Sequence, residues 1–237
     1  MIGVAGFSHL LFFGIIVPAG AIRSKKLLEH ILDMPRQRFF RGVMLQVAAL
    51  TLISLIVARF EHVTVFPHRL PPVNAVVAGV VVLAIAIAFG WTQWTKAVKE
   101  RKPVIVLFMP LDARERLWWV AAAALAGFGE ELTWRGVQTV LLTRLFHNYF
   151  AAVAVCVVMF AIAHAIQGWE STAIIAVFAA AFHVIVWMSG SLYVAMIVHF
   201  IYDLIAGFSY AHLARKLGYF EGRTFAADPA RSATQTI

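Results

Sequence analysis

Charged side chains are scarce in this sequence. Of its 237 residues, 14% are Asp, Glu, Lys or Arg and 62% are hydrophobic. Soluble globular chains are about one quarter charged and about half apolar, so this chain holds more apolar residues than one water-soluble core can bury. The composition excludes an ordinary cytosolic enzyme, a disordered protein and a nucleic-acid-binding module, and it indicates a polytopic membrane protein.

Cysteine is almost absent, and so are the marks of a second domain. Cys156 is the only cysteine, which excludes an internal disulfide and leaves the redox compartment undetermined. The sequence shows neither an internal repeat nor a Gly/Ser-rich linker. We therefore expect one membrane domain over residues 1–237, with a flexible cytoplasmic tail over about 216–237.

Long apolar runs are abundant and predict membrane-spanning helices. The hydrocarbon core of a bilayer is about 30 Å thick and needs about 20 apolar residues per helix. Suitable stretches lie near residues 2–22, 42–58, 73–91, 117–146, 149–166, 172–188 and 192–213. We predict an all-α fold, a polytopic transmembrane helix bundle of about seven spans (six to eight). Residues 92–116 mix basic and apolar side chains, which predicts an amphipathic segment on the cytoplasmic membrane surface.

Positive charge is unevenly distributed among the predicted loops. The formal net charge is +8, and basic residues follow the first and third spans and recur in the tail. The opposite loops hold only Arg59, Arg69 and Arg144. Because cytoplasmic loops of membrane proteins are enriched in Lys and Arg, we predict an N-terminus outside and a C-terminus in the cytoplasm, and no nucleic-acid partner.

Two adjacent carboxylates interrupt the fourth predicted span. An ionisable side chain at the bilayer centre costs about 2.5–3.5 kcal/mol on insertion scales, so such residues point to function. On an α-helix Glu131 and Arg135 are neighbours at i,i+4 and can neutralise each other. Glu130 points about 100° away and stays free to face a polar cavity. Apolar residues on both sides of the pair argue against two solvated glutamates at a helix end.

Three histidines lie in the last three predicted spans. His164 follows Phe160 by four residues, and His199 precedes Asp203 by four. Such a histidine can form a structural hydrogen bond, serve as a catalytic imidazole or supply half of a metal site. His183 has no polar neighbour on its own helix face, and we interpret it as an interhelical hydrogen-bond partner.

Together these residues predict a hydrolytic site inside the membrane. Side chains from three helices can converge at one depth, where Glu130 would deprotonate water and imidazoles would stabilise an oxyanion. If a metal were bound, Glu130, His164, His199 and Asp203 would be plausible zinc ligands. The sequence lacks a His-Glu-x-x-His motif and has no cysteine ligand beyond the isolated Cys156, and a site without a metal is the alternative.

Three motifs in this order resemble a known family. Glu130-Glu131-x-x-x-Arg135, Phe160-x-x-x-His164 and His199-x-x-x-Asp203 are similar to the three motifs of the CPBP family. That family includes CAAX prenyl endopeptidases and bacteriocin-processing or immunity proteins. The resemblance covers about residues 115–207, the expected catalytic core. The flanking Gly-Glu-Glu-Leu-Thr-Trp-Arg-Gly is close to the bacterial form, which implies an integral protein of a bacterial inner (plasma) membrane.

The resemblance implies a glutamate-type intramembrane endopeptidase that cuts a membrane-anchored protein or peptide, and it favours chemistry without a metal cofactor over the zinc alternative. Glu130 would activate water with the help of His164, and His199 with Asp203 would form the oxyanion hole. The family more often has Asn at the last motif position. An ionised Asp203 cannot donate to an oxyanion, so it would be protonated or would orient His199. The supporting residues would be Glu131, Arg135 and Phe160.

Two alternatives of other classes stay open. A non-catalytic membrane scaffold or immunity protein would keep the fold without cleavage, and Asp203 is the residue that favours it. A proton-coupled transporter would also place Glu and His inside the membrane. Transporters commonly contain repeated halves with broken helices, which this sequence does not show.

Overall fold

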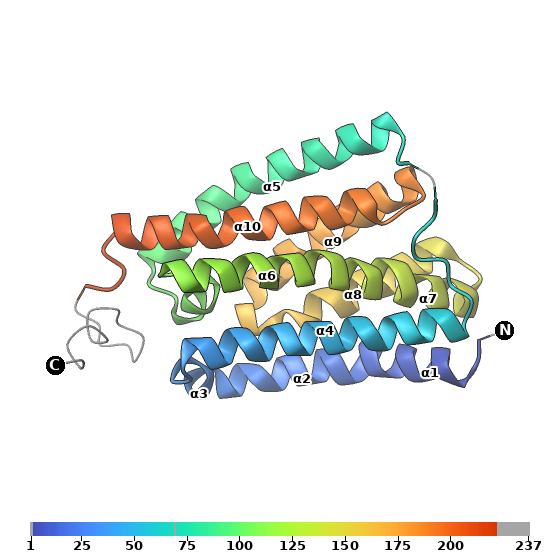
Figure 1. Ribbon diagram of the computed structural model, residues 1–237, viewed down its shortest axis with the longest axis horizontal. Coiled ribbons are helices and arrows are strands. Elements are labelled where there is room, and N and C mark those ends of the chain that lie inside the picture. The colour runs from blue at the N-terminus through green and yellow to red at the C-terminus, as the bar shows by residue number, and fades with distance from the viewer. Residues whose placement is uncertain (1, 69, 222–237) are drawn as a thin grey trace.

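Helices run side by side along the long axis of the molecule in the computed structural model, which describes residues 2–68 and 70–221 (Figure 1). Those residues contain no strand. The first half of the bundle consists of α1 (Val4–Leu11), η1 (Phe12–Ile16), α2 (Val17–Ser24), η2 (Lys25–Leu27), α3 (Leu28–Leu32), α4 (Arg36–Phe60) and α5 (Val73–Lys99). The predicted all-α bundle is confirmed.

The second half of the bundle holds the predicted site. It consists of η3 (Pro103–Phe108), α6 (Ala113–Glu130), η4 (Glu131–Gln138), α7 (Thr139–Phe146), α8 (Tyr149–Ala163), η5 (Ala165–Gln167), α9 (Trp169–Ser189) and α10 (Tyr193–Lys216). The segments η1 and η4 are π-helices, whereas η2, η3 and η5 are 3₁₀-helices. Since η4 continues α6 directly into α7, Ala113–Phe146 is one long rod with a π-helical middle.

Five helical segments are long and apolar enough to cross a membrane, within the part of the chain that the structure describes. They are Val4–Leu32, Arg36–Phe60, Val73–Lys99, Trp169–Ser189 and Tyr193–Lys216. The other two predicted spans differ from these for separate reasons. α8 has only 15 residues. The α6–η4–α7 rod carries charged side chains, and it lies among other helices with contacts to α4 and α10. Its crossing of the membrane stays a prediction.

The ends of the helices follow from local sequence. Asp112 precedes α6, and its side chain accepts a hydrogen bond from the backbone N–H of Glu115 (2.8 Å). Asn148 caps α8 in the same way. Such caps satisfy backbone donors that have no partner within the helix. At the other end of α9, Gly190 has a φ of 62°, a left-handed conformation that glycine adopts without strain.

Two glycines set the distance between α6 and α10. A Cβ atom at Gly127 would lie 2.7 Å from the backbone nitrogen of Phe200, and one at Gly207 would collide with the Trp119 ring. Small residues let helix backbones approach closely. The Trp119 indole also donates to the Asp203 carbonyl (3.1 Å). These contacts bring the end of α6 beside the first half of α10.

The segment between α5 and α6 differs from its prediction. Instead of lying on the membrane surface, Val104–Leu107 are buried within the 3₁₀-helix η3. The Arg36 guanidinium holds this segment from α4, because it donates to the carbonyls of Val106 and Met109 and to the Glu115 carboxylate (2.6 and 3.0 Å). The segment that we expected on the membrane surface is therefore buried inside the protein.

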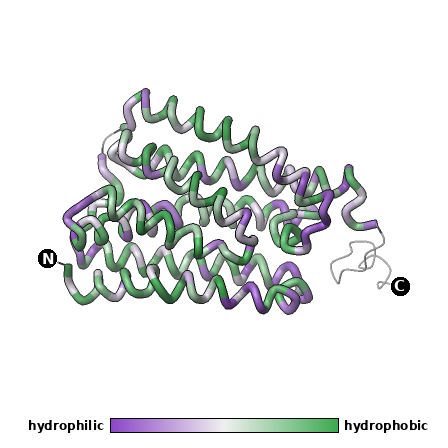
Figure 2. The backbone as a smooth tube through the Cα atoms, turned by 180° about the vertical axis from the view of Figure 1, so that it is seen from behind, coloured by the Kyte–Doolittle hydropathy of each residue, from purple (hydrophilic) through white to green (hydrophobic). Residues whose placement is uncertain are grey.

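Hydrophilic backbone gathers at the end of the bundle that holds α3 and the end of α10, and apolar backbone fills the middle (Figure 2). This pattern fits an integral membrane protein. The N-terminus and the end of α10 lie at opposite ends of the bundle (Figure 1). Which end faces the cytoplasm stays a prediction. After α10 the chain is still packed, since Tyr219 is buried, and the predicted tail beyond residue 221 lies outside the described residues.

Candidate active site

A cavity of about 320 Å³ lies inside the bundle between α4, α5, η3, α6, α8, α9 and α10. Its lining is mostly aromatic and aliphatic. Most of the predicted site residues also line it, and all of these except Phe160 are polar. They are Glu130, Arg135, Phe160, His164, His199 and Asp203. Residues from all three motifs thus meet at one cavity, as the sequence predicted, although their catalytic roles stay predictions.

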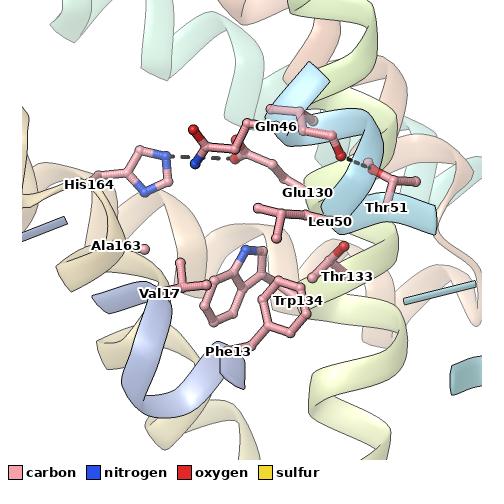
Figure 3. A pocket seen from close by; sticks show the side chains of 12 residues that line it. Phe13, Val17, Gln46, Leu50, Thr51, Glu130, Thr133, Trp134, Ala163 and His164 are labelled. Carbon is pink, nitrogen blue, oxygen red and sulfur yellow. Dashed lines mark hydrogen bonds and ion pairs between the residues drawn. The ribbon is translucent and has the colours of Figure 1, made fainter. Parts of the chain in front are cut away.

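Glu130 is the last residue of α6 and faces His164 at the end of α8 (Figure 3). Its Oε2 atom is 3.7 Å from His164 Nε2. That oxygen is buried and forms no hydrogen bond with any described protein group. His164 Nδ1 lies 2.9 Å from the carbonyl oxygen of Phe160. Because a carbonyl only accepts, Nδ1 carries the proton, and a neutral His164 presents Nε2 to Glu130 as an acceptor.

Glu131 has the opposite environment, although it is the next residue. Its side chain is fully buried, and Oε1 accepts hydrogen bonds from Arg135 Nη1 (3.0 Å) and from His199 Nδ1 (2.8 Å). The first contact is the i,i+4 pair that the sequence predicted. The second joins η4 to α10 and fixes the His199 ring, because a carboxylate that receives one imidazole nitrogen sets the direction of the other.

His199 therefore directs Nε2 toward Asp203. The Nε2 atom is 3.5 Å from Asp203 Oδ2, and both residues belong to α10. The predicted i,i+4 relation holds in the structure. The distance is longer than a usual hydrogen bond between these atom types, so Nε2 is not fully engaged.

Arg135 is enclosed by two aromatic rings. Its guanidinium carbon is 4.2 Å from the centre of the Phe160 ring and 5.5 Å from that of Phe182. A desolvated cation over an aromatic face is stabilised by about 2 kcal/mol. Phe160 thus contacts both Arg135 and His164, whose ring centre lies 4.6 Å away. The sequence analysis did not identify Phe182, since this phenylalanine on α9 stands outside the three motifs.

The π-helix η4 was also unexpected. The carbonyl of Trp134 accepts hydrogen bonds from the Thr139 hydroxyl (2.7 Å) and the Cys156 thiol (3.3 Å). π-helical turns inside α-helices occur frequently at functional sites. All eight residues of η4 are buried, and the segment places Glu131 and Arg135 on the inner side of the rod.

His183 lacks the predicted interhelical hydrogen bond at Nδ1, which is buried without a partner among the described residues. The contact between α8 and α9 at this position uses its backbone instead, since the Tyr149 hydroxyl lies 3.5 Å from the His183 carbonyl.

The sequence left open that Glu130, His164, His199 and Asp203 bind zinc. In the part of the chain that the structure describes, no three His, Cys, Asp or Glu side chains are placed to hold a metal ion together. Chemistry without a cofactor stays a prediction, which the chelator experiment below tests.

The described residues form a helical membrane protein with acidic and imidazole side chains around an internal cavity. Comparison with protein-family models matches residues 112–205 to type II CAAX prenyl endopeptidase Rce1-like proteins. The matched region runs from the start of α6 into α10 and contains every motif residue. The match supports the resemblance to the CPBP family and, in general, an intramembrane protease of the CAAX type. No curated protein and no solved structure matches the chain.

Proposed function

We propose that this protein is an intramembrane endopeptidase that hydrolyses a peptide bond in a membrane-anchored protein or peptide. The observation that carries the proposal is the convergence of Glu130, His164, His199 and Asp203 on one internal cavity. The Rce1-like match over the same residues supports it. The aromatic and aliphatic lining favours a substrate with an apolar group, such as a lipid anchor or a membrane helix, next to the scissile bond.

Glu130 and His164 together suit the activation of water. A water molecule between them can donate one hydrogen to Glu130 Oε2 and the other to His164 Nε2, which directs an oxygen lone pair toward a substrate carbonyl. Glu130 takes the proton as the water oxygen bonds to the carbonyl carbon. The same proton then passes to the amide nitrogen as the C–N bond breaks, and the products are a carboxylic acid and an amine.

His199 suits the stabilisation of the developing oxyanion. Its Nδ1 is bound to Glu131, so only Nε2 can reach the cavity, and donation requires a proton on that nitrogen. An ionised Asp203 cannot donate, and we assign it to holding His199 in its donating form. Glu131, with Arg135 beside it, positions the ring before the reaction begins, and preorganised donors are the main source of such stabilisation.

The test is cleavage of a panel of membrane-anchored and prenylated peptides by the purified protein. We expect Glu130→Gln and His164→Ala to lower the rate by about 10²- to 10⁴-fold, which is the usual contribution of acid–base catalysis. The matched control is Glu29→Gln, since Glu29 is exposed on α3 and far along the chain from the motifs. It should cleave like the wild type.

Two results would contradict this mechanism. Equal cleavage by wild type and Glu130→Gln would exclude Glu130 as the base. Loss of cleavage on addition of a strong chelator, with recovery on zinc addition, would favour the metal alternative. If a folded wild-type protein cuts none of the peptides, the non-catalytic scaffold becomes the better hypothesis.

A further inference from the structure

A second cavity lies beside the first, and Glu130 and His164 line both of them. Its volume is about 110 Å³, and we call it the side chamber (Figure 3). Half of its wall comes from helices that precede the family-matched region. The lining residues are Phe13, Val17, Gln46, Val47, Leu50, Thr51, Gly129, Glu130, Thr133, Trp134, Ala163 and His164.

Polar groups face the side chamber from α4 and η4. The Gln46 amide lies beside Glu130 and His164 in Figure 3, and Thr51 and Thr133 flank the carboxylate on the other side. The Thr51 hydroxyl donates to the Val47 carbonyl (2.8 Å), which leaves its oxygen free to accept a hydrogen bond. With the unpartnered Glu130 oxygen, the chamber offers both donors and acceptors.

Gln46 is an unusual residue for its position. It stands ten residues after Arg36, so by helix rise it lies about 15 Å along α4. Its side chain is exposed, as is that of the adjacent Leu45. An amide exposed to hydrocarbon costs several kcal/mol, whereas leucine costs nothing there. Water in the chamber would remove that cost for Gln46.

The chamber wall is held by a chain of buried polar contacts. The Ser54 hydroxyl lies 3.0 Å from the Thr133 hydroxyl and 3.0 Å from His9 Nε2. His9 Nδ1 is in turn 2.9 Å from the Gln138 side-chain oxygen. These contacts join α1 and α4 to η4. Buried hydrogen bonds therefore fix the helices that form the wall of the side chamber.

We propose that the side chamber binds water and delivers the hydrolytic water to Glu130 by a route separate from the large cavity. This inference rests on the proposed endopeptidase function. One water needs about 10–15 Å³ and two to four polar partners, and the chamber exceeds both requirements. An apolar substrate group that fills the large cavity excludes water from it. A separate chamber that borders the same carboxylate keeps the nucleophile available while the substrate is bound.

Thiol labelling tests the hydration of the chamber without any substrate. A thiol reacts with a charged methanethiosulfonate reagent only as the thiolate, which forms in water and not in hydrocarbon. In protein reconstituted into vesicles, Gln46→Cys should react at least about tenfold faster than Leu45→Cys, the matched lipid-facing control. The native Cys156 is fully buried and gives a low background in the unsubstituted protein. Equal rates at positions 45 and 46 would overturn the proposal.

Kinetics test the supply of water. We expect Gln46→Leu and Thr51→Val to lower kcat about tenfold and to leave KM unchanged, because substrate binds in the other cavity. Leu45→Ala and Leu52→Ala, at exposed positions of the same helix, should keep both constants. Labelling at position 46 with unchanged kcat in both polar variants would show a wet chamber that does not feed Glu130. If the wild type cleaves no peptide, the proposed function fails, and the labelling ratio still decides whether the chamber is hydrated.

Discussion

Glu130 and Glu131 are adjacent in sequence, yet they belong to two different parts of the site. On the Glu131 side, Oε1 receives both Arg135 and His199, and aromatic rings close over the guanidinium. On the Glu130 side, the carboxylate borders two cavities, and its Oε2 atom forms no hydrogen bond with any described group. Glu131 Oε2 and two Arg135 nitrogens also lack a hydrogen-bond partner among the described residues, but Glu131 Oε1 is held by two side chains, whereas Glu130 borders space for water and substrate. Helical geometry alone separates the two, since neighbouring side chains point about 100° apart.

Removal of Glu131 should have the largest effect on stability. Glu131→Leu leaves the Arg135 cation buried without its partner, and breaking a buried ion pair from one side costs about 3–5 kcal/mol. Glu130→Gln should change the free energy of unfolding by less than about 0.5 kcal/mol, since its oxygen forms no protein hydrogen bond. Reversible unfolding in detergent or bicelles measures both. Similar losses for the two variants would mean that the two sides do not differ in the way described.

The rings around Arg135 should have an intermediate effect. Phe182→Leu removes one face of the aromatic enclosure and should cost about 1–2 kcal/mol of stability, because the cation is desolvated. Phe128→Leu, at an exposed position of α6, is the matched control and should stay within about 0.5 kcal/mol of the wild type. The same unfolding assay compares them. Equal stability of the two variants would exclude Phe182 as a support for Arg135.

Asp203→Asn should give the smallest effect, and its comparison with Asp203→Leu tests the role assigned to His199. Asp203→Asn supplies an amide donor at the same place, so we expect kcat to stay within about tenfold of the wild type. Asp203→Leu removes the carboxylate that holds His199 in its donating form and supplies no donor in its place, so it should lower kcat by about 10²-fold. Peptide cleavage under saturating substrate measures kcat. A loss in Asp203→Asn as large as in Asp203→Leu would show that the ionised carboxylate itself is required.

Local spacing predicted the elements of the site well. Glu131 with Arg135, and His199 with Asp203, lie at i,i+4 on single helices, and the structure places each pair in contact. Such pairs depend only on helical periodicity. The bond between His199 and Glu131 was not predictable in this way, because it requires knowing that α10 packs against η4. Phe182 and the side-chamber residue Gln46 were missed for the same reason.

The differences between the predicted and the observed segments also have physical causes. The apolar run Val104–Leu107 lies between basic residues, and this pattern suits both a helix on the membrane surface and a segment buried in the protein. The choice depends on Arg36, which reaches this segment from 70 residues earlier in the chain. The composition predicted seven spans; within the described residues five helices satisfy length and apolarity, and whether the other two cross the membrane stays a prediction. The charged α6–η4–α7 rod is buried among other helices, and this position is decided by tertiary packing.

The π-helix also decides where the length of this chain can change. A π-turn holds one residue more than an α-turn, because its hydrogen bonds join residue i to i+5. Deletion of a single residue within 131–138 would let the rod return to an ordinary α-helix and would leave the turns after it facing as before, because the π-turn holds that residue as an extra. The same deletion within α7 would rotate everything after it by roughly 100°. A change of one residue in length is therefore absorbed in η4 and not in the α-helical parts of the rod.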